Sequence, residues 1–205
     1  QGRIAIAALP PIVCAAMPRA LAEFSRVHPA VAVRLHDVQH QRAVTMLRDG
    51  IVDIAVTLKP APAEGLSFEG IGFDVAHLVC RRDHPLARRC RLQWHDVGDY
   101  PFIGITRISS VRHLTDAAFV HGELAIEPRY EVEQVPSAVA LVEAGLGITA
   151  LPSLTFAMFK NRDLVTRPLA GPVVRRHVGF ITRSRRTSPE FVADLKDAIR
   201  KQIEQ

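Results

Sequence analysis

The first sixty residues alternate regularly between short apolar runs and segments whose apolar side chains recur at helical spacing. The opening apolar run is typical of a strand buried on both faces. His28-Pro29 closes the first helical segment, in which Pro18 should either cause a kink or begin the main body. This alternation predicts an α/β fold with a parallel sheet and right-handed crossovers. In order, the expected elements are strand 4–9, helix 12–27, strand 31–35, helix 43–47 and strand 53–57.

The second half of the chain repeats this order after a loose stretch rich in Gly and Pro. Extended chain at 68–82 leads into it, and a strand at 177–182 leads out toward a last helix. Ser188 as N-cap and Pro189 at the first helical position mark the start of that helix. We expect two Rossmann-like lobes, with 1–74 and 185–205 in lobe I and 75–184 in lobe II. The elements expected in lobe II are strand 102–105, helix 109–120, strand 129–135, helix 137–144 and strand 147–151.

The composition is that of an ordinary globular chain, because 48% of its 205 residues are hydrophobic and 23% are charged. No apolar run reaches the length of a membrane span, and Pro10-Pro11 interrupts the stretch that could resemble a secretory leader. The three scattered cysteines favour a reducing compartment, so we expect a cytoplasmic protein without membrane contact. Since the chain begins inside a core strand, we expect it to be part of a longer protein.

Sequence motifs of common enzyme sites are missing, including the phosphate-binding loop, the nucleophile elbow and the His-Glu-x-x-His zinc motif. His36 and His40 are four residues apart but straddle a strand end and a helix start, which argues against a shared metal ion. Gly145-Leu146-Gly147 follows a helix, as a C-cap does, instead of opening one as a dinucleotide-binding loop does. We expect no catalytic residue, metal or cofactor.

Four expected helix starts follow directly on strands, and the free backbone N–H groups at such starts favour anions. In a parallel sheet these starts share the edge at which the strands end, where ligands bind. Taken one at a time, Ser109, Ser110 and Ser137 are better explained as helix caps. Together, the four starts favour a ligand cleft between the lobes. They are Leu9-Pro10-Pro11-Ile12, Gln39-His40-Gln41, Thr106 to Ser110, and Val135-Pro136-Ser137.

A set of short motifs runs through essentially the whole chain. The most specific are His84-Pro85-Leu86 and the stretch from Ala144 to Ile148. The others are Gly2 with Ile4 and Ile6, Met17-Pro18 through Leu21 and Phe24 to His28-Pro29, Leu47, Gly50, Asp53-Ile54-Ala55, Pro101-Phe102-Ile103 and Leu151-Pro152. In this order they resemble the effector-binding domain of LysR-type transcriptional regulators, a two-lobed fold similar to type 2 periplasmic binding proteins.

The resemblance implies a sensor that binds a small effector in its cleft and forms a homodimer, or a tetramer in the full-length protein. DNA would be bound by an N-terminal winged helix-turn-helix that is absent from this chain. Helices near 12–27 and 111–121 would meet antiparallel in the dimer. Carried over position by position, the family's effector contacts fall on Leu9, Pro11, Ile12, His40, Gln41, Leu58, Thr106, Ser109, Ser110, Val135, Pro136 and Ser137.

Lobe II is expected to hold the polar, carboxylated group of the effector, because Leu9 and Pro11 stand where the family often has Ser or Thr. The apolar part of the effector would pack on Leu9, Pro11 and Leu58. Each hydrogen bond should contribute about 1 kcal/mol, or more if it is charge-assisted. The hydroxyls expected to hold the carboxylate are those of Thr106, Ser109 and Ser110.

Two other functions would use the same cleft. One is a solute-binding protein that feeds a transporter, although the expected lack of a leader and the free cysteines argue against it. The other is an enzyme on the same fold, such as a dehydratase, with His40 as a base but without a partnered acid. We therefore favour the ligand-sensing domain of a regulator.

The net charge of +5, from 26 Lys plus Arg against 21 Asp plus Glu, and a pI near 9.6 suggest nucleic acid as a partner. Splitting the charge by the expected lobes gives +6 for 75–186 and −1 for the rest. We interpret the basic side chains as solvated surface of lobe II, in preference to steering of an anionic ligand or contact with a partner. Two clusters would be neighbours if strands 77–82 and 177–182 pair. They are Arg81-Arg82 with Arg88, Arg89 and Arg91, and Arg175-Arg176 with Arg183, Arg185 and Arg186.

Overall fold

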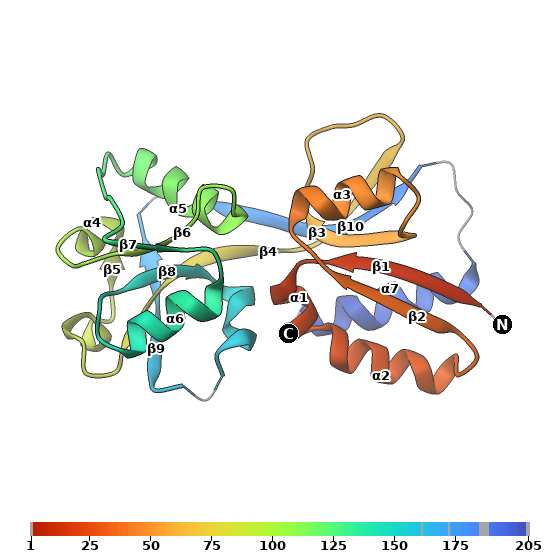
Figure 1. Cartoon of the computed structure of the whole chain (residues 1–205), viewed down its shortest axis with the longest axis horizontal. Coiled ribbons are helices and arrows are strands. Elements are labelled where there is room, and N and C mark those ends of the chain that lie inside the picture. Colours follow the sequence, from red (N-terminus) through yellow and green to blue (C-terminus); the bar gives the residue numbers. More distant parts are fainter. Residues whose placement is uncertain (1, 161, 172, 185–188, 204–205) are drawn as a thin grey trace. The chain divides into compact units, whose positions relative to one another are not determined.

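The computed structural model describes residues 2–160, 162–171, 173–184 and 189–203 (Figure 1). Its contacts divide the chain into two compact units, which we call unit 1 and unit 2. Unit 1 consists of Gln1–Phe73 and Arg176–Gln205, and unit 2 of Asp74–Arg175. Two strands, β4 and β10, contain residues of both units.

Unit 1 is built on parallel strands that alternate with helices, as the sequence predicts. β1 pairs in parallel with β2 on one side and with β3 on the other, and β10 then adds to β3 in the antiparallel direction. The predicted parallel order is therefore confirmed, and β10 makes the sheet mixed. The elements are β1 (Arg3–Ala8), α1 (Pro10–Ala15), α2 (Met17–Val27), β2 (Ala32–Asp37), α3 (His40–Arg48), β3 (Ile54–Leu58), the first part of β4 (Leu66–Arg81), β10 (Arg175–Arg183) and α7 (Glu190–Ile203).

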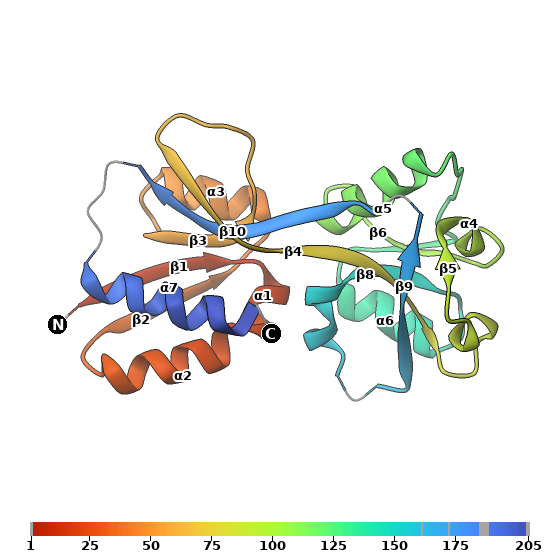
Figure 2. The same ribbon diagram turned by 180° about the vertical axis from the view of Figure 1, so that it is seen from behind.

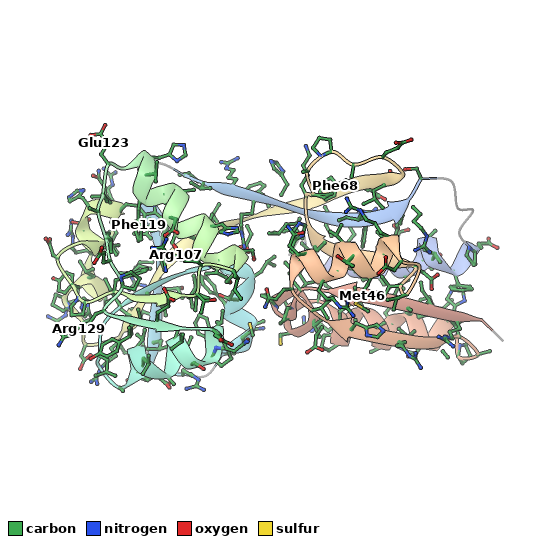
Figure 3. All side chains as sticks on the ribbon, turned by 45° about the horizontal axis from the view of Figure 1, so that its top comes forward. Met46, Phe68, Arg107, Phe119, Glu123 and Arg129 are labelled. Carbon is green, nitrogen blue, oxygen red and sulfur yellow. The ribbon has the colours of Figure 1, made fainter. Side chains whose placement is uncertain are left out.

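The strands of unit 1 are covered on both faces, which explains why β1 is apolar almost throughout. Ala5 and Ala7 share a core with α3, where Met46 is buried (Figure 3). Because strand side chains alternate, Ile4 and Ile6 point to the other face, on which α2 and α7 lie side by side (Figures 1 and 2). Ile4 and Ile6 are 1% and 0% exposed, so each face is closed by its helices.

The segment expected as one helix at 12–27 is two helices. α1 begins with Pro10 and Pro11, whose fixed φ suits a first helical turn. Ala16 ends α1 and is also the N-cap of α2, which has Pro18 in its first turn. Pro18 thus begins the main body of the helix, one of the two outcomes that the sequence allowed. At the C-terminal end the expected cap Ser188 lies outside the described residues, and α7 is described from Glu190.

Unit 2 repeats the order of strand, helix, strand and helix. β6 and β7 pair in parallel, and Phe102 forms a further parallel bridge with Ile148. Phe119 of α5 packs edge-on against Trp94 and Phe102 with ring centroids 5.5 Å away (Figure 3). The elements are η1 (Pro85–Arg88), β5 (Leu92–Gln93), α4 (Trp94–Val97), β6 (Ile103–Ile105), α5 (Ser110–His121), β7 (Tyr130–Val132), α6 (Val135–Glu143), β8 (Thr149–Pro152), η2 (Ser153–Met158) and β9 (Leu164–Ala170).

Strand β10 differs from the sequence expectation in its neighbours. Residues 178–181 pair with β3, and 77–81 of β4 pair with β9 and in part with β8. The sequence raised a pairing of 77–82 with 177–182 as a condition for two Arg clusters to be neighbours. The two strands are neighbours in the sheet, but residues 77–79 pair with β8 and β9. β10 does lie beside β4, but nearer the start of that strand: a Cβ atom on Gly179 would be only 2.2 Å from the carbonyl oxygen of Glu69 and 2.7 Å from the Phe68 ring (Figure 3). The close approach requires glycine at position 179.

The position of β10 also changes the distribution of charge. Residues 176–184 group with unit 1, whereas the sequence placed them in lobe II. Unit 2 then has 12 Lys plus Arg against 11 Asp plus Glu, a net +1, and unit 1 has 14 against 10, a net +4. In unit 2, Arg81, Arg82 and Arg89 form ion pairs with Asp83, Asp163 and Asp96. The excess positive charge therefore lies in unit 1, and the basic side chains do not form one lobe II surface.

Candidate functional site

The first predicted contact segment follows β1 in unit 1. The register pairs Ala8 with both Asp37 of β2 and Val56 of β3, so the three strands end at one edge. Leu9 and Ile12 are 4% and 0% exposed and belong to the core of the unit, and Pro11 is half-buried. The apolar part of the predicted site is thus largely packed inside unit 1.

His40, the first residue of α3, lies at the same edge of unit 1. Its Nδ1 atom is 3.0 Å from Oγ1 of Thr57, a fully buried residue of β3. Burial and, next, the positive charge of Arg176 lower the pKa of His40 from its usual 6.5. Of the other predicted contacts here, Gln41 is exposed on α3 and Leu58 is half-buried at the end of β3.

Three predicted hydroxyl residues lie together where β6 ends in unit 2. The amide of Thr106 donates to the carbonyl of Val132 at 2.9 Å, and the Thr106 carbonyl accepts from the amide of Ser109 at 3.0 Å. Ser109 is the N-cap of α5, and its Oγ accepts from the amide of Val111 at 3.2 Å. Ser110 is the first residue of α5 and is half-buried. The Ser109 hydroxyl oxygen thus caps α5, which agrees with the interpretation of Ser109 as a helix cap in the sequence.

The fourth predicted segment begins α6, next to the end of β7. The helix starts at Val135, so the expected start at Ser137 is two residues late, and Gln134 is the N-cap. Ser137 is therefore not a cap. Val135 is 9% exposed, whereas Pro136 and Ser137 are exposed. Since the amide of Thr106 bonds to Val132, the β6 and β7 segments share one edge of unit 2.

Arg112 is a buried residue of the unit 2 edge that sequence reasoning missed. Its NH1 group donates to the carbonyl of Ile105 at 3.2 Å and to Glu131 at 2.8 Å, and its Nε donates to Asp116 at 2.6 Å. The side chain is 6% exposed. Arg112 therefore ties β6, β7 and α5 together immediately before Thr106. The spacing of Arg112 and Asp116, four residues apart, was the available sequence signal.

Residues from each of the two most specific sequence motifs line a cavity of about 360 Å³ in unit 2: His84 and Pro85 from the first, and Gly145 to Gly147 from the second. Pro101 and Gly147 lie on it, and they precede β6 and β8, so the cavity is at the opposite end of β6 from Thr106. The Nδ1 atom of His84 accepts from the amide of Leu86 and so begins η1. Gly147 has a φ of 157°, and a Cβ atom there would be 2.2 Å from the carbonyl oxygen of Pro101. His84 and Gly147 of these motifs therefore stabilise the local backbone of unit 2.

Within the described part of the chain, no group of three or more His, Cys, Asp or Glu side chains could hold a metal ion. No described helix is long and apolar enough to cross a membrane. Cys14 and Cys90 are exposed thiols, and burial raises the pKa of the Cys80 thiol to about 11. Cys80 is thus protonated at neutral pH and packs as an apolar side chain.

A family model described as the LysR substrate binding domain matches residues 1–204. The chain belongs to this family. The LysR domain is 28% identical over 183 residues to the uncharacterized HTH-type transcriptional regulator YbhD of Escherichia coli K12, covering 89% of this chain and 58% of YbhD. It therefore spans about three-fifths of this relative.

Solved structures of LysR-family domains share the fold at low sequence identity. The effector-binding domain of QuiR in complex with shikimate superposes with a TM-score of 0.84 at 18% identity, covering 100% of this chain and 99% of that one. The BenM effector-binding domain with its effector benzoate gives a TM-score of 0.82 at 19% identity, covering 98% and 91%. The expected two-lobed, periplasmic-binding-protein-like fold of the LysR domain is confirmed.

Proposed function

We propose that the LysR domain senses a small carboxylate for a transcriptional regulator and contacts it with the strand-end edges of its units. The observation that carries this function is the family match over residues 1–204, and it favours a regulator over a transport protein or an enzyme. The twelve predicted contacts are at a strand end or in the segment that leads from it into the next helix, six in unit 1 and six in unit 2. Shikimate and benzoate, bound by QuiR and BenM, are both carboxylates.

In the full-length protein we propose that an N-terminal helix-turn-helix binds DNA and that the protein is a cytoplasmic homodimer or tetramer. Effector binding would act by stabilising one arrangement of the oligomer over another, since a ligand shifts an equilibrium only by its differential affinity. We assign the domain no catalytic step, cofactor or metal.

Calorimetric titration of the domain tests the proposal, with shikimate and benzoate first and a wider panel of aromatic and aliphatic carboxylates next. We expect one chemical class to bind, and Ser110→Ala to weaken it about five-fold, the equivalent of one hydrogen bond of about 1 kcal/mol. Ser25→Ala, on the exposed face of α2, is the matched control and should bind as the unmodified domain does. The proposal fails if no carboxylate binds, or if Ser110→Ala binds each of them unchanged.

A further inference from the structure

The edge of unit 1 at which β3 ends carries a positive charge from a distant part of the sequence. β10 runs antiparallel to β3, with Val178 opposite Leu58, and the amide of Lys59 donates to the carbonyl of His177 at 2.8 Å. This register places Arg176 just beyond the carboxyl end of β3. Its Nε atom is buried and its side chain is half-buried.

His40 completes this edge from the start of α3. Because Thr57 is fully buried, its hydroxyl needs a partner inside the protein, and the His40 ring provides one at 3.0 Å. When that hydroxyl donates to Nδ1, the proton of the neutral ring is on Nε2. In that tautomer Thr57 orients the ring and leaves Nε2–H to donate to a ligand.

Arg176 and His40 act on each other electrostatically. Burial and the charge of Arg176 lower the pKa of His40, so the ring is neutral at neutral pH and the positive charge of the pair is that of the guanidinium. Arg176 also takes part in other interactions of the chain. What matters for a ligand is that a half-buried cation attracts an anion more strongly than an exposed one, because water screens it less.

We propose that Arg176 and His40 form a carboxylate subsite in unit 1, in which the guanidinium attracts the anion and Nε2–H of His40 donates a hydrogen bond to it. Thr57 is a positioning residue that holds the ring. The proposal rests on the proposed function, whose effector it describes: the acidic group is bound by unit 1, and the hydroxyls of unit 2 take uncharged polar groups. The net +4 of unit 1 against +1 of unit 2 agrees with this assignment.

An NMR titration with acetate, a carboxylate with only a methyl group attached, tests the subsite without knowledge of the effector. The signals followed are the His40 ring and the Leu58 amide, with sodium chloride as the ionic-strength control. We expect saturable shifts with a dissociation constant of about 5–100 mM, the range of one charge-assisted interaction. Arg176→Gln should raise the dissociation constant for acetate at least about five-fold, and Arg176→Lys should raise it by less.

Three further variants make the outcome decisive. Arg48→Gln, at the other end of α3, removes the same charge and should leave the acetate shifts unchanged. Arg107→Gln removes the exposed charge beside Thr106 in unit 2 (Figure 3) and should also leave them unchanged. Thr57→Val should weaken acetate and alter the His40 ring signals, and Thr57→Ser should restore both. Should Arg176→Gln unfold, His40→Gln with the Leu58 amide as readout replaces it.

The subsite is refuted if acetate causes no saturable shift at His40 and Leu58, or if Arg107→Gln weakens acetate while Arg176→Gln does not. Either result leaves the calorimetric binding of an effector intact, so the proposed function would survive. Conversely, acetate shifts that depend on Arg176 in a domain that binds no member of the carboxylate panel would support the subsite and contradict the proposed effector class.

Discussion

The strand-end edges of the two units differ in how their polar groups are used. In unit 2 the edge is held by its own polar groups: the Ser109 Oγ caps α5, the Thr106 backbone bonds to β7 and to Ser109, and Arg112 binds two carboxylates and a carbonyl. In unit 1 the Nδ1 atom of His40 lies 3.0 Å from Oγ1 of Thr57, and this hydrogen bond orients the His40 ring. Polar groups that already bond within the protein are less available to a ligand. Counting the hydroxyls in the sequence therefore overestimates how many polar groups unit 2 can offer to a ligand.

The largest effect is expected from removing one arginine from each unit, the buried Arg112 of unit 2 and the half-buried Arg183 of unit 1. Arg112→Met leaves the Ile105 carbonyl and two half-exposed carboxylates without their cation, so the free energy of unfolding should fall by about 1–3 kcal/mol. Arg183→Met removes donors from the carbonyls of Leu47 and Val52 and should cost a similar amount. Urea titration measures both.

Affinity should distinguish these two variants. The carbonyl bound by Arg112 directly precedes Thr106, whereas Arg183 binds carbonyls before β3, at the other end of that strand from Leu58. Arg112→Met should therefore also lower the affinity for the carboxylate identified by calorimetry, whereas Arg183→Met should leave that affinity unchanged. Equal affinity in both variants would show that the unit 2 edge does not depend on the Arg112 network.

A cap substitution should separate folding from binding within the unit 2 edge. Ser109→Ala removes the acceptor of the Val111 amide and should lower the free energy of unfolding by about 1 kcal/mol, the usual contribution of an N-cap. Ser109→Asp keeps an acceptor and is the control that should restore stability. If Ser109→Ala weakens the effector as much as Ser110→Ala does and leaves unfolding unchanged, Ser109 is a ligand contact and not a cap.

The smallest expected effect is the acid response of unit 1. Because the folded-state pKa of His40 is lowered, the unfolded chain binds its proton more readily, and stability falls as the pH drops below about 6.5. His40→Gln should therefore reduce that fall. The check compares urea midpoints near pH 7.5 and pH 5.5. An identical acid response with and without His40 would contradict the lowered pKa.

Much of the fold could be predicted because the spacing of apolar residues within a short segment shows which of its faces are buried. The parallel order of unit 1 and the helix–strand repeats of unit 2 follow from runs such as 4–9 and from closing residues such as Gly50. The path of β10 could not be predicted, since its pairing with β3 joins segments distant in the sequence. That single difference moves Arg176 from one unit to the other.

The site was predictable in its location but not in its chemistry. Strand ends followed by helix starts identify the edges, because parallel strands end together. Which side chains remain available depends on hydrogen bonds that no spacing reveals, such as the bond between His40 and Thr57 or the network of Arg112. Arg112 and Asp116 showed a helical pair in the sequence, but nothing there indicated its contacts with β6 and β7.

The two edges are compared most simply by their response to a bare carboxylate. In an acetate titration followed by amide and ring NMR signals, we expect His40 and Leu58 of unit 1 to shift saturably, and Thr106 and Ser110 of unit 2 to respond no more than they do to sodium chloride. A saturable response at Thr106 and Ser110 with none at His40 and Leu58 would contradict a carboxylate subsite in unit 1. It would show instead that unit 2 binds the acidic group.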